Sequence, residues 1–196
     1  MLGRARVLPV LRSDSAASAR AQVDALVGAG LPAIELTRST PGWAEALAGV
    51  RLAHPQLCLG LGTVRDADDV RRAHDLEVDF LVSPWPAPAV RAAADELGVP
   101  LVEGGFTPGE LAAAAAHGPA KLFPAAPVGP GYLRALLPVL PGARVLPTGG
   151  IGLDAVPAWL DAGAHAVGVG SDLLRALVAD PAGTAERLGD LVGGAR

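Results

Sequence analysis

AKLFPAAPVGPGYLRALLPVLPGARVLPTGG, residues 120–150, contains a short apolar run, a segment with helical spacing and a second apolar run. The first run, 120–123, and the second, 144–147, have the length and composition of buried strands. The segment between them, 130–138, repeats its apolar residues with the period of a helix. A strand, a helix and a strand in this order predict two parallel strands joined by a crossover helix.

The same unit recurs along the whole chain. Strands are expected at 7–11, 33–36, 57–61, 79–82, 100–103, 120–123, 144–147 and 165–169. Helices are expected at 15–29, 41–53, 66–76, 86–97, 107–117, 130–138, 153–162 and 171–179, with a last helix at 182–192. Eight strand-helix pairs predict an α/β protein with a closed (β/α)₈ TIM barrel at about 7–179, in a single domain, 1–196. A doubly wound open sheet competes, but its G-x-G-x-x-G turn after the first strand is absent.

The composition limits which residue types can form the core and which classes of partner are expected. Hydrophobic residues make up 51% of the chain and aromatic residues 4%, so the core must be aliphatic. The net charge is −4 and no basic tract occurs, which argues against a nucleic-acid partner. No signal peptide and no apolar run of about 18 residues is visible, so we expect no membrane association and a cytoplasmic protein. The one cysteine, Cys58, is expected to be a buried structural thiol.

Lys121 occupies an unusual position in this composition. It is the one lysine of the chain, against 15 arginines, and it lies in an apolar strand. A charged ammonium group is costly to bury there. The lysine stem could instead extend to the surface, so the strand alone leaves a chemical role and a surface position equally open.

The barrel prediction brings Lys121 together with other charged residues, because active sites of such barrels lie at the carboxyl ends of the strands. Glu35 ends the second strand, Arg12 follows the first, and Arg38 lies shortly after Glu35. A lysine must be neutral to attack a carbonyl, and burial near a cation favours the neutral amine. A glutamate in an apolar strand suits a general acid/base, and an arginine suits a substrate carboxylate. The alternative is a Lys–Glu ion pair that only stabilises the barrel.

Two turns look suited to phosphate. Gly149 and Gly150 follow the seventh strand, and Gly170 and Ser171 follow the eighth. Glycines allow close approach of the backbone, and N–H groups of a turn or a helix N-terminus attract anions. Barrels frequently hold a phosphate group after these two strands.

The remaining polar residues indicate no metal site. Asp66, Asp68 and Asp69 are expected to lie at a helix N-terminus, where carboxylates interact favourably with the helix dipole. The four histidines are scattered, without paired spacing, so neither a metal nor another cofactor is expected. Trp43 and Trp159 fall within helical segments and are expected to pack.

Six motifs along the chain together resemble a known family. They are AIELTRSTP (33–41), LGTV (61–64), VSP (82–84), KLFPA (121–125), PTGGI (147–151) and GVGSDL (168–173). Their order and spacing, over about 7–178, resemble the 2-keto-3-deoxy-6-phosphogluconate aldolases. That family also includes the 2-keto-3-deoxy-6-phosphogalactonate and 4-hydroxy-2-oxoglutarate aldolases. The segments after Lys121 look closer to the phosphogalactonate branch.

The resemblance implies a class I aldolase that works without a metal, on a (β/α)₈ barrel, as a homotrimer. It assigns the Schiff base to Lys121 and acid/base catalysis to Glu35. It implies a pyruvyl pocket lined by Thr63, Pro84 and Phe123, with Thr63 at the substrate carboxylate.

The resemblance also implies which residues recognise the substrate and which reaction it undergoes. Arg12 matches the arginine that phosphogalactonate-type members carry after the first strand. The residues implied to bind the phosphate are Gly149, Gly150, Gly170 and Ser171. The implied reaction is cleavage of a 2-keto-3-deoxy-6-phospho sugar acid, of phosphogalactonate or phosphogluconate type, to pyruvate and glyceraldehyde 3-phosphate. A different phosphate-binding barrel isomerase or synthase, or a non-catalytic barrel that binds a sugar acid or phosphate, remains the alternative.

Several positions depart from the family pattern. Ser39 stands where gluconate-type members carry an arginine, with Arg38 one residue earlier. Glu103 replaces a proline, and we name it as the second candidate for the acid/base. Trp85 and Phe106 replace small or polar residues and are expected to narrow the mouth of the barrel.

Overall fold

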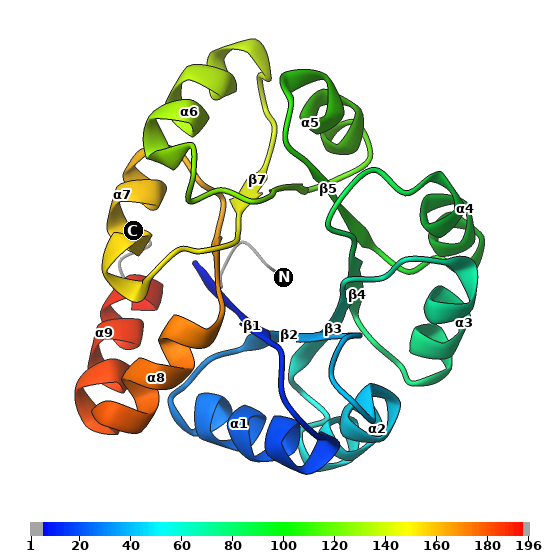
Figure 1. Cartoon of the computed structure of the whole chain (residues 1–196), viewed down its shortest axis with the longest axis vertical. Coiled ribbons are helices and arrows are strands. Elements are labelled where there is room, and N and C mark those ends of the chain that lie inside the picture. Colours follow the sequence, from blue (N-terminus) through cyan, green and yellow to red (C-terminus); the bar gives the residue numbers. More distant parts are fainter. Residues whose placement is uncertain (1–5, 194–196) are drawn as a thin grey trace.

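The structure, a computed structural model, describes residues 6–193; the outermost parts of the predicted domain, 1–5 and 194–196, lie outside these residues. Parallel strands form its centre and helices surround them (Figure 1). The strands are β1 (Val7–Leu11), β2 (Ala33–Thr37), β3 (Cys58–Gly62), β4 (Phe80–Val82), β5 (Leu101–Gly105), β6 (Ala120–Leu122), β7 (Val145–Pro147) and β8 (Val167–Val169). All eight predicted strands are confirmed, and no strand end differs from the prediction by more than two residues.

The strands form a nearly closed barrel. They follow the order β7-β6-β5-β4-β3-β2-β1-β8, so β1 pairs with both β2 and β8. A single parallel bridge between Thr148 and Gly168 connects the remaining two edges, just beyond β7 and within β8. The predicted (β/α)₈ barrel is therefore confirmed and the doubly wound sheet is wrong.

The helices follow the predicted order. They are α1 (Ala16–Gly28), α2 (Trp43–Ala53), α3 (Ala67–Asp75), α4 (Pro88–Leu97), α5 (Pro108–Ala115), α6 (Gly129–Leu136), α7 (Val156–Asp161), α8 (Ser171–Ala179) and α9 (Pro181–Gly193). Short 3₁₀ turns at Leu137–Val139 and Leu153–Ala155 replace the end of one predicted helix and the start of another. Pro138 has no N–H to donate, and Pro157 is favoured in the first turn of α7, so the α-helices end and begin beside these prolines.

Side chains at helix N-termini fix where several helices begin. The Asp66 side chain accepts a hydrogen bond from the Asp69 N–H at 2.8 Å, and Asp68 lies in the same first turn of α3. The predicted placement of these three carboxylates at a helix N-terminus is confirmed. Thr107 and Glu110 form a reciprocal capping box at α5, which satisfies N–H groups that a helix start leaves unpaired.

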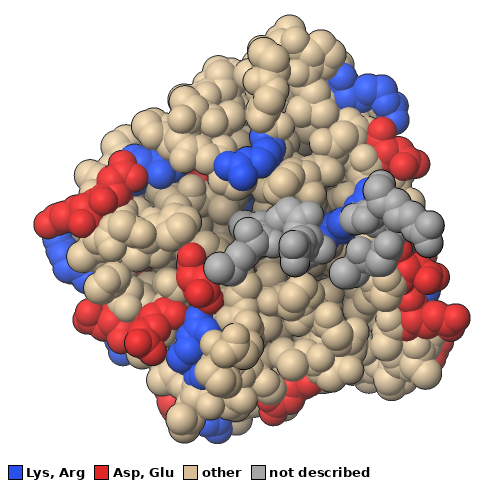
Figure 2. Space-filling view, turned by 180° about the vertical axis from the view of Figure 1, so that it is seen from behind, with Lys and Arg blue, Asp and Glu red and all other residues tan. Residues whose placement is uncertain are grey.

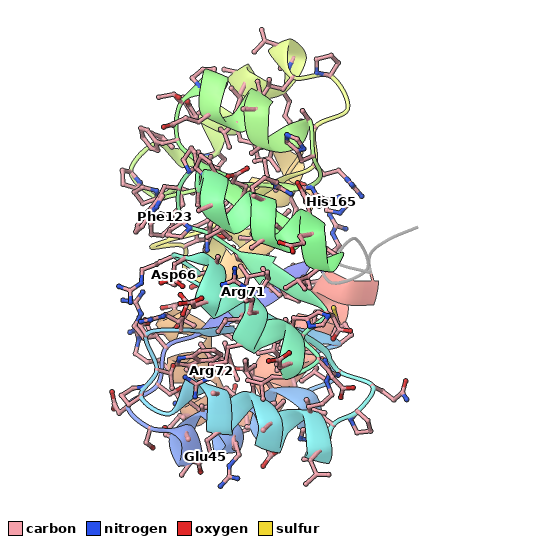
Figure 3. The ribbon with its side chains drawn as sticks, turned by 90° about the vertical axis from the view of Figure 1, so that its right-hand side faces the viewer. Glu45, Asp66, Arg71, Arg72, Phe123 and His165 are labelled. Carbon is pink, nitrogen blue, oxygen red and sulfur yellow. The ribbon has the colours of Figure 1, made fainter. Side chains whose placement is uncertain are left out.

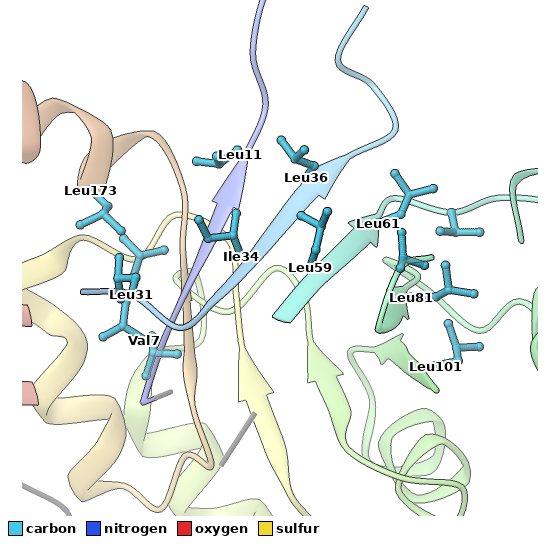
Figure 4. Close-up of a cluster of buried hydrophobic side chains, with 14 of the residues drawn as sticks. Val7, Leu11, Leu31, Ile34, Leu36, Leu59, Leu61, Leu81, Leu101 and Leu173 are labelled. Carbon is cyan, nitrogen blue, oxygen red and sulfur yellow. The ribbon is translucent and has the colours of Figure 1, made fainter. Parts of the chain in front are cut away.

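Alternation along each strand separates two apolar cores. Ile34 and Leu36 of β2 face the helices, where they join the large core between the barrel and the helical ring (Figure 4). Ala33 on the same strand faces the barrel interior, in a smaller core with Phe80 and Leu146. Since successive side chains of a strand point to opposite faces, Glu35 shares the interior side with Ala33.

The surface shows no concentration of one charge on the face of Figure 2, where acidic and basic side chains are interspersed. Within the described residues, no helix is long and apolar enough to cross a membrane.

Candidate active site

A cavity of about 600 Å³ opens at the carboxyl ends of the strands. Phe123, which lines it, and His165, which precedes β8, lie at opposite ends of the barrel (Figure 3). Every residue predicted for the site lines this cavity: Arg12, Glu35, Thr63, Pro84, Lys121, Phe123, Gly149, Gly150, Gly170 and Ser171. Barrel closure thus brings together residues from seven of the eight strand ends.

Lys121 and Glu35 form the buried polar part of the cavity. Lys121 Nζ lies 3.5 Å from Glu35 Oε1, and their side chains are 7% and 1% exposed. Ala120 and Leu122 on either side of Lys121 pack toward the helices, so strand alternation directs the lysine inward. Glu35 Oε1 accepts no hydrogen bond from the described residues. A primary amine and a carboxylate are thus held close together, away from bulk water, with the carboxylate free to exchange a proton.

Aromatic and backbone groups shape the wall beside the lysine. Lys121 Nζ lies 5.4 Å from the centre of the Phe123 ring. Gly149 packs against that ring, and a Cβ there would come within 2.8 Å of it. The φ angle of Gly149 is +99°, which side chains rarely tolerate, so both sterics and backbone favour glycine. Arg12 extends from the end of β1 at the rim and makes no hydrogen bond or ion pair with any described residue.

The other half of the cavity is built from the loops after β7 and β8. Gly150 has a φ angle of +73°, and α8 begins at Ser171. Asp172 connects the two loops, because its Oδ2 accepts a 2.8 Å hydrogen bond from the N–H of Leu153. That N–H, more than the Arg175 guanidinium, lowers the pKa of Asp172 from its ordinary 3.8, although burial opposes the shift.

Sequence reasoning missed some residues of the cavity. Arg175 lines it from α8, with its Nη atoms 3.0 Å from Asp172 and 3.4 Å from Ser171 Oγ. Its sequence position could have predicted this, because Arg175 lies four residues after Ser171 and therefore one turn further along the same face of the helix. Thr37 also lines the cavity, two residues beyond Glu35 on the inward face of its strand. Thr148 lines it as well, and this residue belongs to the turn after the seventh strand for which phosphate binding is predicted.

Two charged residues considered for the site lie outside the cavity. Arg38 does not line the cavity; its Nε contacts Asp69 at 2.7 Å, and this hydrogen bond raises the pKa of Arg38. Glu103 points away from the barrel interior and accepts a 2.8 Å hydrogen bond from the N–H of Ala87. Arg38 follows directly after the inward-facing Thr37, the last residue of β2, and Glu103 follows directly after the inward-facing Val102 of β5. A step of one residue turns the side chain to the opposite face.

The expectation for Phe106 is also wrong, whereas the expectation for Trp85 holds in part. Phe106 is absent from the cavity lining and stacks on Tyr132, with ring centroids 6.2 Å apart. Trp85 lines the cavity and is 52% exposed, so it adds bulk at the mouth.

The two tryptophans expected to pack do so, whereas Cys58 is less buried than expected. Trp159 is 2% exposed and belongs to the core, while Trp43 packs partly against it. Cys58 is half-buried rather than buried, and that burial raises the pKa of its thiol. Across residues 6–193, no group of three or more His, Cys, Asp or Glu side chains is placed to hold a metal ion.

A (β/α)₈ barrel with a buried lysine beside a glutamate at the carboxyl ends of its strands has the design of a class I, Schiff-base aldolase. Comparison with known proteins gives the family. The sequence model described as "Aldolase: KDPG and KHG aldolase" matches residues 1–185. The chain belongs to this family, and it is an aldolase.

Individual sequences and solved structures similar to this chain are also aldolases of this family. The chain is 34% identical over 163 residues to 2-dehydro-3-deoxy-phosphogluconate aldolase of Pseudomonas aeruginosa, a match that covers 80% of this chain and 72% of that protein. It is similar to the native KDPGal structure, with a TM-score of 0.86, 29% identity and coverage of 96% and 94%. It is also similar to KDPG aldolase from Legionella pneumophila, captured with pyruvate as a covalent carbinolamine intermediate, with a TM-score of 0.83, 25% identity and coverage of 98% and 95%.

Proposed function

We propose that this aldolase cleaves a 2-keto-3-deoxy-6-phospho sugar acid to pyruvate and glyceraldehyde 3-phosphate. The observation that supports this most directly is the buried Lys121–Glu35 pair, 3.5 Å apart in a cavity of about 600 Å³. A cavity of that size suits a small, charged, extended substrate. The phosphate and the carboxylate of such a substrate can each meet complementary groups at different parts of the lining.

The reaction begins at the C2 ketone. The neutral Nζ of Lys121 attacks the C2 carbon, and the carbonyl π electrons move to oxygen. Protonated Glu35 gives its proton to that oxygen and takes one from the nitrogen, so that a neutral carbinolamine forms and Glu35 is again protonated. Glu35 then donates a proton to the carbinolamine hydroxyl, which leaves as water while the nitrogen lone pair forms the C=N bond. The product is a protonated imine between Lys121 and the substrate, with Glu35 now a carboxylate.

The imine then accepts the electrons of the bond that breaks. Glu35 takes the proton of the C4 hydroxyl, and the oxygen electrons form the aldehyde as the C3–C4 bond breaks. Those bond electrons flow into the imine and give an enamine on Lys121, while glyceraldehyde 3-phosphate departs. Protonation of C3 by Glu35 and hydrolysis of the imine release pyruvate and regenerate the amine. This sequence needs no cofactor, since the imine itself is the electron sink.

Different parts of the cavity bind different groups of the substrate. Arg12, without a partner among the described residues, and the Thr63 hydroxyl bind the carboxylate. Pro84 and Phe123 form the walls around the pyruvyl carbons. The phosphate binds at the two loops whose residues are Gly149, Gly150, Gly170 and Ser171, where backbone N–H groups and the N-terminus of α8 favour an anion. Arg175 adds a cation at the same end.

The experiment that tests this function is reductive trapping with pyruvate. Borohydride should reduce the imine and inactivate the protein irreversibly, with the added mass on the peptide that contains Lys121. The assay is unusually clean, because Lys121 is the one lysine and the α-amino group is the one competing primary amine of the chain. Lys121→Arg is the matched control, since a guanidinium remains protonated and cannot attack. An unmodified Lys121 peptide after treatment would refute the Schiff-base mechanism.

The preferred epimer and the assembly also belong to the proposal. Arg12 after β1 and Ser39 in place of the gluconate-type arginine favour the galactonate epimer at least as much as the gluconate one. The protein is expected to assemble as a homotrimer, as the resemblance implies. Light scattering would measure the mass in solution, and a monomer at assay concentration would contradict the trimer.

A further inference from the structure

Thr63 lines the cavity with a backbone conformation that threonine rarely adopts. Its φ angle is 61°, in the left-handed region, where a branched Cβ crowds the neighbouring carbonyl. Non-glycine residues persist in this conformation when the surrounding structure holds them there, and they concentrate at functional sites. The contacts that hold Thr63 are therefore informative about the site.

The chain after Thr63 is held by Asp69, in the first turn of α3. One carboxylate oxygen of Asp69 accepts a 3.2 Å hydrogen bond from the N–H of Arg65, two residues after Thr63. The same carboxylate lies 2.7 and 2.9 Å from Arg38 Nε. Asp69 is 5% exposed, so these donors replace the water that a carboxylate would otherwise require.

The chain before Thr63 is held by Arg38. The backbone N–H of Arg38 donates a 2.8 Å hydrogen bond to the carbonyl of Gly62, the residue that precedes Thr63. Arg38 contacts the chain before Thr63 through its backbone, and Asp69 contacts the chain after it at Arg65, next to the 3.1 Å hydrogen bond from the Val64 N–H to the Val82 carbonyl. The Arg38–Asp69 ion pair joins these two attachments. Asp66, which caps the N-terminus of α3, lies at the same end of the barrel as Phe123 (Figure 3).

We propose that the Arg38–Asp69 ion pair is a positioning device that holds Thr63 in its left-handed conformation, with its hydroxyl placed for the substrate carboxylate. The inference rests on the proposed function, in which Thr63 binds that carboxylate. It gives a role to the arginine that stands one residue before the gluconate-type position. Arg38 acts on the substrate through Asp69 and Thr63, without contact.

The principal test is Asp69→Asn, which keeps the size of the side chain but removes its charge. The pyruvate concentration for half-maximal borohydride inactivation and the KM for the phosphorylated keto acid should both rise about tenfold, which corresponds to about 1.4 kcal/mol. The kcat should change by less than about twofold, because Lys121 and Glu35 are untouched. A purely structural ion pair would lower the Tm and leave both concentrations unchanged, and that result would overturn the proposal.

Asp68→Asn is the matched control. Asp68 lies beside Asp69 in the same turn of α3, but its side chain is 93% exposed and pairs with Arg71. It should leave both concentrations at the wild-type value. An equal rise in this variant would show a general electrostatic effect of α3 and would also overturn the proposal.

A double-mutant cycle with Thr63→Ala separates the inference from the proposed function. If Asp69 acts through Thr63, Asp69→Asn should produce no further rise in the Thr63→Ala background. An equal rise in both backgrounds contradicts the inference alone. A wild-type KM for Thr63→Ala contradicts the carboxylate role of Thr63, and the inference falls with it. Should Asp69→Asn fail to fold, Arg38→Lys replaces it; a rise of about threefold supports the proposal and no rise overturns it.

Discussion

Gly62 at the end of β3 leaves room for the carboxylate of Glu35 on the neighbouring strand. A Cβ at Gly62 would lie 1.8 Å from Glu35 Oε1 and 2.5 Å from its carboxyl carbon, far inside any real contact. Glu35 is 1% exposed and has little space for retreat. The missing side chain at Gly62 is therefore a condition for the 3.5 Å separation between Glu35 and Lys121.

Gly62→Ala should accordingly behave as an active-site variant, although it removes no functional group. The new methyl group would displace the Glu35 carboxylate from Lys121, and kcat should fall by about 10²-fold or more, within the range of a lost general acid/base. Steady-state kinetics on protein with a native circular dichroism spectrum would measure this. Gly109→Ala in α5 is the control, because a Cβ there meets nothing within 4 Å. Wild-type turnover of Gly62→Ala would show that the Glu35 carboxylate has no fixed catalytic position.

Glu35→Gln should slow turnover by about 10²–10⁴-fold while it keeps the fold, because the amide has similar shape but cannot exchange the required protons. Glu103→Gln is the comparison variant, since Glu103 faces Ala87 and Arg91 outside the cavity. Its kcat should remain close to wild type. If instead the Glu103 variant lost turnover and the Glu35 variant kept it, the acid/base role would belong to Glu103.

Cleavage should persist in excess chelator, because the imine on Lys121 stabilises the carbanion without a metal ion. The measurement is kcat with and without EDTA after extended dialysis. Complete loss of activity that an added divalent metal restores would overturn the class I mechanism.

Removal of the substrate phosphate should lower kcat/KM strongly. Each charge-assisted hydrogen bond lost at the loops after β7 and β8 is expected to cost about 1.5–3 kcal/mol. The comparison uses both phosphorylated epimers, their dephosphorylated forms and 4-hydroxy-2-oxoglutarate. Arg175→Ala should weaken the phosphorylated substrates alone, and by a smaller factor, because the Arg175 side chain is 71% exposed. Equal kcat/KM with and without phosphate would mean that the two glycine turns are structural.

Asp172→Asn should destabilise the protein at neutral pH and have little effect in acid. The pKa of Asp172 is lowered in the folded protein by the Leu153 N–H, so its carboxylate stabilises the fold above the unfolded pKa. That contribution is lost as the pH falls through the lowered folded pKa. At pH 7 the variant should have a Tm only slightly below that of the wild type, because the Asp172 side chain is 42% exposed and solvent screens its interactions. Melting curves from pH 7 into acid would test this, and a Tm difference that grows in acid would contradict it.

Local sequence patterns were enough to predict the architecture and most of the cavity. Apolar runs and helical spacing are local properties, and they predicted all eight strands and the order of the helices. Lys121 is the one lysine and lies in an apolar strand, and glycines follow the last two strands. These local features were enough to predict a reactive lysine and a phosphate site. Once the strands are parallel in a barrel, their carboxyl ends must meet, and the ten predicted site residues do line one cavity.

Which charged residues face that cavity depends on how the barrel closes and could not be predicted from local patterns. Glu35 and Glu103 both lie in apolar strands, yet Glu35 shares a face with Ala33 and Glu103 is one residue past the inward Val102. A shift of one residue reverses the direction of a strand side chain, and the sequence pattern around each glutamate is too similar to reveal it. Arg38 is the same case, because its partner Asp69 comes from the next strand-helix unit. Side-chain direction and partners from distant segments depend on barrel closure, which no local pattern contains.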